Sequence, residues 1–165
     1  MRNIIQSKAV LLGNNIDTDQ IYPGRFLALV EPKEIGSHCM EGLDIETQKL
    51  VPGSIVVAGT NFGCGSSREH AVISLMNADV KAVVAESFAR IFFRNAINLG
   101  LPLITCKGIS KKFQTGQTLK IDITGGTVTI EETNEVLPCD KLNEHILAII
   151  EAGGIKPLFR AKTGK

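Results

Sequence analysis

The fold is decided by residues 54–105, which read SIVVAGTNFGCGSSREHAVISLMNADVKAVVAESFARIFFRNAINLGLPLIT. Three short apolar runs in this stretch have the length and composition of buried β-strands, at 54–58, 80–85 and 101–105. Two longer stretches repeat apolar side chains at helical spacing, at 66–77 and 87–99. The order strand, helix, strand, helix, strand predicts an α/β fold with a βαβαβ centre, parallel strands and right-handed crossovers.

Shorter elements flank this centre. Pro102, at the start of the third apolar run, favours a strand start or a strand at the edge of the sheet. Residues 13–31 form a polar, turn-rich segment with an apolar tip. The remaining expected elements are a strand at 7–12, a helix at 32–40, a β-hairpin of 118–123 and 127–130, and a helix at 141–152. Together they predict one domain, residues 1–165, with a β-hairpin added to the βαβαβ centre.

Composition excludes several functional classes. Hydrophobic residues make up 44% of the 165 residues and charged residues 21%, which is typical of a globular domain rather than a disordered chain. A net charge of +1 gives no field that would attract nucleic acid or an anionic membrane. No apolar run approaches the ~18 residues of a membrane-spanning helix, and the N-terminus is interpreted as a first strand rather than a signal peptide. We expect a cytoplasmic protein.

The four cysteines carry no metal-binding pattern. They stand at 39, 64, 106 and 139, so their separations of 25, 42 and 33 residues contain no C-x-x-C pair. Iron–sulfur clusters usually take several closely spaced thiolates, so this chain is expected to bind no metal or cluster by itself. Reduced thiols in a cytosolic protein explain these cysteines.

The segment Asn61-Phe-Gly-Cys-Gly-Ser-Ser-Arg-Glu-His70 combines groups that suit an anion. Its glycines allow tight turns, and its serine pair and arginine lie at the start of the predicted helix. Free backbone N–H groups and the positive end of the helix dipole attract anions there, and an arginine can bind a carboxylate through two parallel hydrogen bonds. A serine beside positive charge is also deprotonated more readily, so carboxylate binding and general-base chemistry are both indicated.

Simpler interpretations of this segment stay open. Ser66 followed by Glu69 is a capping box, which would make the pattern a well-capped helix alone. The segment is neither a phosphate-binding P-loop, because G-K-[ST] is missing, nor a G-x-S-x-G nucleophile elbow. Cys64 is interpreted as a packing residue, and His70 as a surface or packing group.

Three ordered motifs resemble the aconitase swivelling domain, a β/β/α domain. The motifs are residues 61–71, residues 86–102 (ESFARIFFRNAINLGLP) and residues 15–24 (NIDTDQIYPG), and the resemblance is strong over about 8–106. As a separate short chain, the sequence resembles the small subunits of two-chain isopropylmalate and homoaconitate dehydratases. Full aconitases carry the same domain fused to the domains that bind the cluster.

The resemblance implies a reaction and a set of roles. A hydro-lyase of this family removes water from a 2-hydroxy acid and returns it at the neighbouring carbon. A [4Fe–4S] cluster in a large partner subunit acts as the Lewis acid, so the small subunit works only within a heterodimer or heterotetramer. The resemblance assigns proton abstraction to Ser66 and carboxylate binding to Ser67 and Arg68, and it places Asp17 and Asp19 beside the site. An Asx-type turn alone would also explain the two aspartates.

The resemblance also bears on the substrate. The segment after the Asp-Thr-Asp stretch reaches the variable γ-group in this family, and homoaconitate-type members place an arginine near its tip. The matching position here is Ala28, flanked by Leu27 and Leu29, so we expect an isopropyl group rather than a third carboxylate. Arg25 is close enough in sequence to swing inward. The implied reaction converts 2-isopropylmalate to 3-isopropylmalate in leucine biosynthesis, with homoaconitate, methylmalate (citraconate) and dimethylmalate dehydratases as alternatives.

Two hypotheses of other classes compete with the hydro-lyase. One is a stand-alone anion-binding regulatory module that uses residues 63–68, and the other is a cysteine-based redox or metal protein. The lack of paired cysteines argues against the second. Arg90 and Arg94 lie four residues apart on the second predicted helix and share a face, which we interpret as structural or as a subunit contact.

Overall fold

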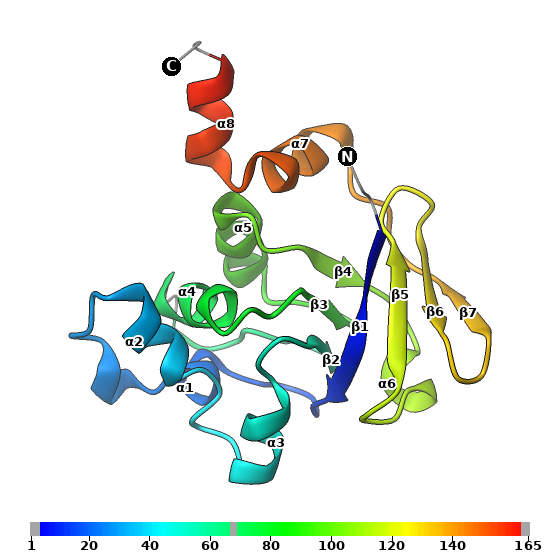
Figure 1. The fold of residues 1–165 in the computed structure, drawn as a ribbon, viewed down its shortest axis with the longest axis horizontal. Helices are drawn as coiled ribbons and strands as arrows, with labels where there is room; N and C mark the ends of the chain where they lie inside the picture. The colour runs from blue at the N-terminus through cyan, green and yellow to red at the C-terminus, as the bar shows by residue number, and fades with distance from the viewer. Residues whose placement is uncertain (1–3, 67–68, 163–165) are drawn as a thin grey trace.

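The computed structural model describes residues 4–66 and 69–162. Within these ranges a seven-stranded mixed sheet has the order β4-β3-β2-β1-β5-β6-β7 (Figure 1). Strands β1 to β4 pair in parallel, and β5 to β7 continue the sheet from β1 as an antiparallel meander. The strands are β1 Ile4–Leu11, β2 Ile55–Ala58, β3 Ala82–Ala85, β4 Leu103–Thr105, β5 Thr118–Asp122, β6 Thr127–Ile130 and β7 Glu135–Pro138.

The helices lie mainly on one side of the parallel strands, with α6 on the other (Figure 1). The α-helices are α1 Thr18–Ile21, α2 Pro32–Ser37, α3 Ile45–Leu50, α4 Glu69–Asn77, α5 Arg90–Leu99, α6 Ile109–Lys112, α7 Glu144–Ala152 and α8 Ile155–Lys162, and one 3-10 helix, η1, spans Gly24–Phe26. No helix within the described ranges is long and apolar enough to cross a bilayer.

Both faces of the parallel strands are buried, which explains their unbroken apolar sequences. In β2, Val56 and Ala58 belong to the cluster that packs under α2, α4 and α5, while Ile55 and Val57 belong to a second cluster on the opposite face. The second cluster includes residues of α6 and of the meander, such as Ile109. The parallel core is thus enclosed between helices and the curled continuation of its own sheet.

The structure confirms the predicted α/β centre. Parallel strands β2, β3 and β4 alternate with α4 and α5, and β4, which follows Pro102, lies at the edge of the sheet. Gly100 ends α5 in the left-handed conformation, with φ of 97°. The predicted hairpin is present as β5 and β6.

Several elements were not predicted. Strand β7 extends the hairpin to a three-stranded meander, and α8 follows α7. Within the segment expected to be turn-rich, 13–31, the chain forms α1 and η1. Of these elements, α1 bears on the candidate site, because its Thr18 contacts the Ser66 loop.

Candidate functional site

The loop that carries Ser66 lies where the loops after three parallel strands meet. The loop after β2 pairs with the loop after β1 through Asp17 and Cys64, and with the loop after β3 through Phe62 and Phe88. The Gly63 N–H donates to the Ile16 carbonyl at 2.8 Å. Ligands of open α/β sheets bind outside the carboxyl ends of the strands, so this junction is the expected place for a site.

Two glycines give this loop its course, as the sequence indicates. Gly63 and Gly65 have φ values of 86° and 93°, in the left-handed region that disfavours side chains. A Cβ atom on Gly63 would also lie 2.2 Å from Cγ of the buried Phe92. Gly63 therefore lets the loop pass directly over α5, and this contact brings the first half of α5 beside Ser66.

The Gly63→Ala variant is expected to lose about 2–4 kcal/mol of unfolding free energy, the sum of left-handed backbone strain and a clash in a packed core. Gly116→Ala is the matched control, because Gly116 has φ of 97° but nothing within 4 Å of the added Cβ. Urea unfolding of both variants gives their losses of unfolding free energy, and the difference between them is the cost of the clash with Phe92. Equal losses would show that Phe92 adapts and that the close approach is not required.

A cleft of about 660 Å³ opens beside Ser66, a volume within the range of small-molecule sites. Its lining residues come from α1, the Ser66 loop and the start of α5: Thr18, Gly63, Gly65, Ser66, Ala89, Arg90, Ile91, Phe92, Arg94 and Asn95. Among the described lining residues there are two arginines and no aspartate or glutamate. The cleft is therefore suited to a small anion.

Hydrogen bonds from Thr18 to backbone carbonyls hold the loop at Ser66 in place. The Thr18 hydroxyl donates to the Ser66 carbonyl at 2.8 Å, and the Thr18 N–H donates to the Cys64 carbonyl at 2.8 Å. Ser66 is exposed, and within the described ranges no group hydrogen-bonds its hydroxyl. The loop is thus fixed by α1 while the hydroxyl stays available to a molecule in the cleft.

Arg90 and Arg94 form the charged wall of the cleft. They lie one turn apart on α5, both are exposed, and neither forms an ion pair with any residue that the structure describes. Asn95 follows them along the same wall. Two guanidinium groups without described partners create positive potential beside Ser66, which favours an anionic ligand and stabilises a deprotonated hydroxyl.

The two aspartates of the Asp-Thr-Asp stretch stabilise α1 and the turn that follows it. Asp17 caps α1: its side chain accepts from the Gln20 N–H at 2.8 Å, and the Gln20 side chain accepts from the Asp17 N–H at 3.0 Å. The Asp19 carboxylate accepts from the Gly24 N–H at 2.8 Å. These contacts fix α1 and therefore the position of Thr18 against Ser66.

None of the expected substrate-binding residues Arg25, Leu27, Ala28 and Leu29 is among the described residues that line the cleft. Arg25 is paired with Glu41 at 3.3 Å and lies over the Phe26 ring, 4.6 Å from its centroid. Leu27 is 40% exposed and Ala28 is exposed, whereas Leu29 packs against the core. The structure therefore does not bring these residues to Ser66. Their segment contacts α4, the helix that follows the Ser66 loop, because the Leu29 carbonyl lies 3.1 Å from Nε2 of His70.

Titratable groups outside the cleft are either buried and unreactive or have a structural role. Burial raises the pKa of Cys39 and Cys106 to about 12, so these thiols are poor nucleophiles. A hydrogen bond from Ser110 lowers the pKa of Glu86, whose carboxylate also accepts from the Gly108 N–H and anchors α6. Across 4–66 and 69–162, no group of three or more His, Cys, Asp or Glu side chains is placed to hold a metal ion.

Local sequence patterns indicate only part of the candidate site. Ser67 and Arg68 lie outside the described residues, so their assignments stay predictions. Thr18 stands between two aspartates that give the stronger local signal, although its own hydroxyl and N–H contact the Ser66 loop. The spacing of Arg90 and Arg94 predicts a shared helix face, but it does not indicate that this face borders the cleft.

Comparisons with known proteins agree on a family. Residues 46–108 match the Aconitase C-terminal domain family. The chain is 50% identical over 163 residues to the isopropylmalate/citramalate isomerase small subunit of Methanocaldococcus jannaschii, covering 98% of this chain and 97% of that one. It is 48% identical over 161 residues to 3-isopropylmalate dehydratase small subunit 1 of Methanopyrus kandleri, covering 97% and 95%. The crystal structure of 3-isopropylmalate dehydratase (leuD) from Methanocaldococcus jannaschii superimposes with a TM-score of 0.90, at 40% identity and 97% and 95% coverage.

Proposed function

Because this chain belongs to the 3-isopropylmalate dehydratase small-subunit family, we propose that it is the small subunit of a hydro-lyase that interconverts 2-isopropylmalate and 3-isopropylmalate. Its place would be in leucine biosynthesis. The observation that carries the proposal is the cleft itself, whose described lining combines the exposed Ser66 with two arginines and no aspartate or glutamate. A stand-alone regulatory module is the less favoured alternative.

Ser66 acts as the general base in this proposal. Before dehydration its side chain is in the deprotonated form, and during dehydration this alkoxide oxygen takes the proton from the carbon next to the one that bears the leaving hydroxyl, which makes Ser66 a neutral hydroxyl. During rehydration it returns a proton to the other carbon, so the hydroxyl group changes position and no net proton is consumed. The proton lies α to a carboxylate and is weakly acidic, so positive groups must stabilise the charge that develops. Arg90 and Arg94 supply such charge at the cleft wall.

The substrate carboxylates are held by this chain's cationic and hydroxyl groups. We assign Ser67 and Arg68 to this role by family resemblance. Arg90 and Arg94 add to it by position, since both line the cleft and neither has a described ion-pair partner. Thr18 and Asp17 act indirectly, by holding the Ser66 backbone.

The iron–sulfur cluster and the large subunit are proposed from the family. The described residues offer no ligand set for such a cluster, so we place it in the large subunit of a heterodimer or heterotetramer. When bound there, the cluster supplies a Lewis acid for the leaving hydroxyl. The free thiols of Cys39, Cys64, Cys106 and Cys139 fit a reducing compartment, and we propose the cytoplasm.

Citramalate, which is 2-methylmalate, is a second candidate substrate. The Methanocaldococcus jannaschii relative carries both isopropylmalate and citramalate in its name. An apolar segment tip at Leu27 and Ala28 admits either a methyl or an isopropyl group, and neither brings a third charge to bury.

Reconstitution tests the proposal. This chain alone should show no turnover of 2-isopropylmalate, and addition of a large iron–sulfur subunit of the same family should produce it. The reconstituted pair is also tested with citramalate, dimethylmalate and homocitrate as substrates. The large subunit alone is the control. Full activity of the isolated chain, or no activity of the pair on any of these acids, would contradict the proposal.

A further inference from the structure

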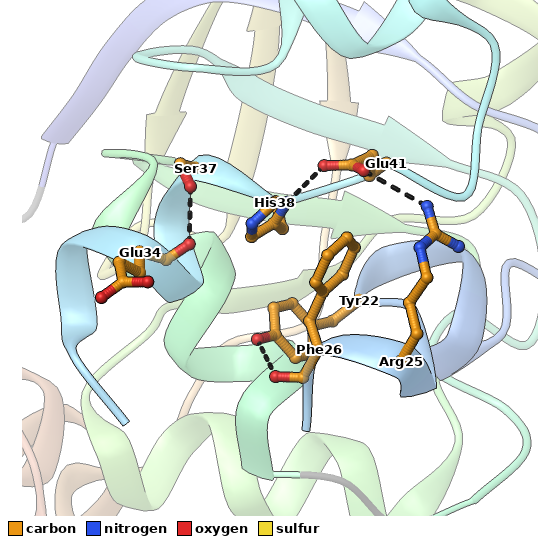
Figure 2. Close-up of polar contacts among 7 residues, drawn as sticks. All are labelled: Tyr22, Arg25, Phe26, Glu34, Ser37, His38 and Glu41. Carbon is orange, nitrogen blue, oxygen red and sulfur yellow. Dashed lines mark hydrogen bonds and ion pairs between the residues drawn. The ribbon is translucent and has the colours of Figure 1, made fainter. Parts of the chain in front are cut away.

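The segment between η1 and α2 is held at two backbone carbonyls by two aromatic side chains. The Tyr22 hydroxyl donates to the Phe26 carbonyl at 2.6 Å (Figure 2). Nε2 of His70 lies 3.1 Å from the Leu29 carbonyl, and because a carbonyl only accepts, His70 must carry its proton on Nε2 and donate. The two held carbonyls flank the exposed pair Leu27 and Ala28.

The two holding side chains come from two elements that adjoin the Ser66 loop. Tyr22 ends α1, the helix whose Thr18 contacts the Ser66 carbonyl. His70 lies in the first turn of α4, four residues after Ser66. Their rings stack with centroids 5.6 Å apart and planes 24° apart, so the two supports form one unit.

The Tyr22 hydroxyl stays protonated and can donate its hydrogen bond. Tyr22 is fully buried, and burial, with Glu34 and Glu41 nearby, raises the pKa of its hydroxyl, so it remains a donor. The Phe26 carbonyl also accepts from the Leu29 N–H at 3.1 Å, which closes the turn between the two supports. Loss of either side-chain hydrogen bond would cost free energy, so the segment has a preferred position.

The side chains of the segment make a separate set of contacts. Figure 2 shows Glu41 between Arg25 and His38, at 3.3 Å and 2.5 Å, with the Phe26 ring against the His38 ring at a centroid distance of 3.7 Å. The Arg25–Glu41 pair contributes little because Arg25 is exposed and solvent screens the pair. The Glu41–His38 contact is partly buried, as are the hydrogen bonds of Tyr22 and His70. The Tyr22 and His70 bonds differ from it because they act on the backbone carbonyls of the segment itself, on either side of the tip.

We propose that His70 and Tyr22 are positioning residues that fix the Leu27–Ala28 tip relative to the Ser66 loop and thereby set the substrate preference. The inference rests on the proposed function in one respect, that this tip reads the γ-group of the substrate. The holding contacts themselves do not depend on that function, so they can be tested separately.

The first test measures the segment directly. Hydrogen–deuterium exchange of the backbone amides of residues 26–30 is followed in the full chain for His70→Leu, His70→Gln and wild type. Loss of one hydrogen bond should accelerate exchange by about three- to tenfold in His70→Leu. His70→Gln keeps an N–H donor and should restore most of the protection. His145→Leu is the matched control, because His145 is exposed on α7. Unchanged exchange in His70→Leu would overturn the inference.

The second test measures preference in the reconstituted enzyme. His70→Leu should raise KM for 2-isopropylmalate and reduce its kcat/KM advantage over citramalate by about three- to tenfold, with kcat unchanged, since a displaced tip no longer contacts the side group. His70→Gln should recover the preference, and Tyr22→Phe should reproduce the effect if His70→Leu fails to fold. A fall in kcat with unchanged preference would overturn the inference. Absence of turnover in the wild-type pair would instead reject the proposed function.

Discussion

The Ser66→Ala variant is expected to lower kcat of the reconstituted enzyme by about 10²- to 10⁴-fold, the usual contribution of a positioned general base. The substitution removes the proton acceptor but keeps the loop in place, because Thr18 contacts the Ser66 carbonyl rather than its hydroxyl. KM for 2-isopropylmalate should change much less than kcat, since the carboxylates are held by other groups.

Steady-state kinetics together with urea unfolding check this expectation. Ser37→Ala is the control, because Ser37 is an exposed serine whose hydroxyl only donates to the Glu34 carbonyl (Figure 2). That variant should keep the wild-type kcat. A Ser66→Ala enzyme with a kcat within a few-fold of wild type would reject the assignment of Ser66 as the base.

The Ala28→Arg variant is expected to shift the kcat/KM ratio by about 10- to 150-fold toward the tricarboxylic homologue homocitrate, the worth of a hydrogen bond to a charged group. The wild-type tip offers no charge to a third carboxylate, whose unpaired burial is costly. The added guanidinium can bind it through two parallel hydrogen bonds.

Val30→Arg is the matched control for this shift. Val30 is 86% exposed and lies two residues beyond Ala28 on the same segment, so the same charge is added away from the tip. Competition between 2-isopropylmalate and homocitrate gives the ratio directly. Equal shifts in both variants would show that net charge, and not the tip position, determines the preference.

The α/β centre was predictable because its signals are local and redundant. Strands β2 and β3 are buried on both faces, so their sequences are continuous apolar runs, and α5 repeats apolar residues until Gly100 ends it. Helices α1 and α6 have four residues each, too few to display a period of 3.6. Strand β7 buries Leu137 but exposes Val136 at 57%, so it gives a weak signal on its own.

The site was predictable where its residues adjoin in sequence and not where the fold assembles them. The motif around Ser66 predicts tight turns, and the conformations of Gly63 and Gly65 agree with them, while the role of Ser66 stays a prediction. Thr18 lies 48 residues from Ser66, and its hydrogen bond depends on α1, an unpredicted helix. Whether Arg90 and Arg94 faced solvent, a subunit or a cleft depended on the path of the Ser66 loop over α5, which no local pattern encodes.

The central claim is that this chain supplies the base of a shared active site through Ser66. The most direct measurement is a competition, in which a fixed amount of large subunit and wild-type chain is titrated with the Ser66→Ala chain while 2-isopropylmalate turnover is recorded. The account predicts that turnover falls in proportion to the fraction of variant chain, because the variant occupies the large subunit and adds no activity. Turnover that stays constant or rises as the variant is added would contradict it.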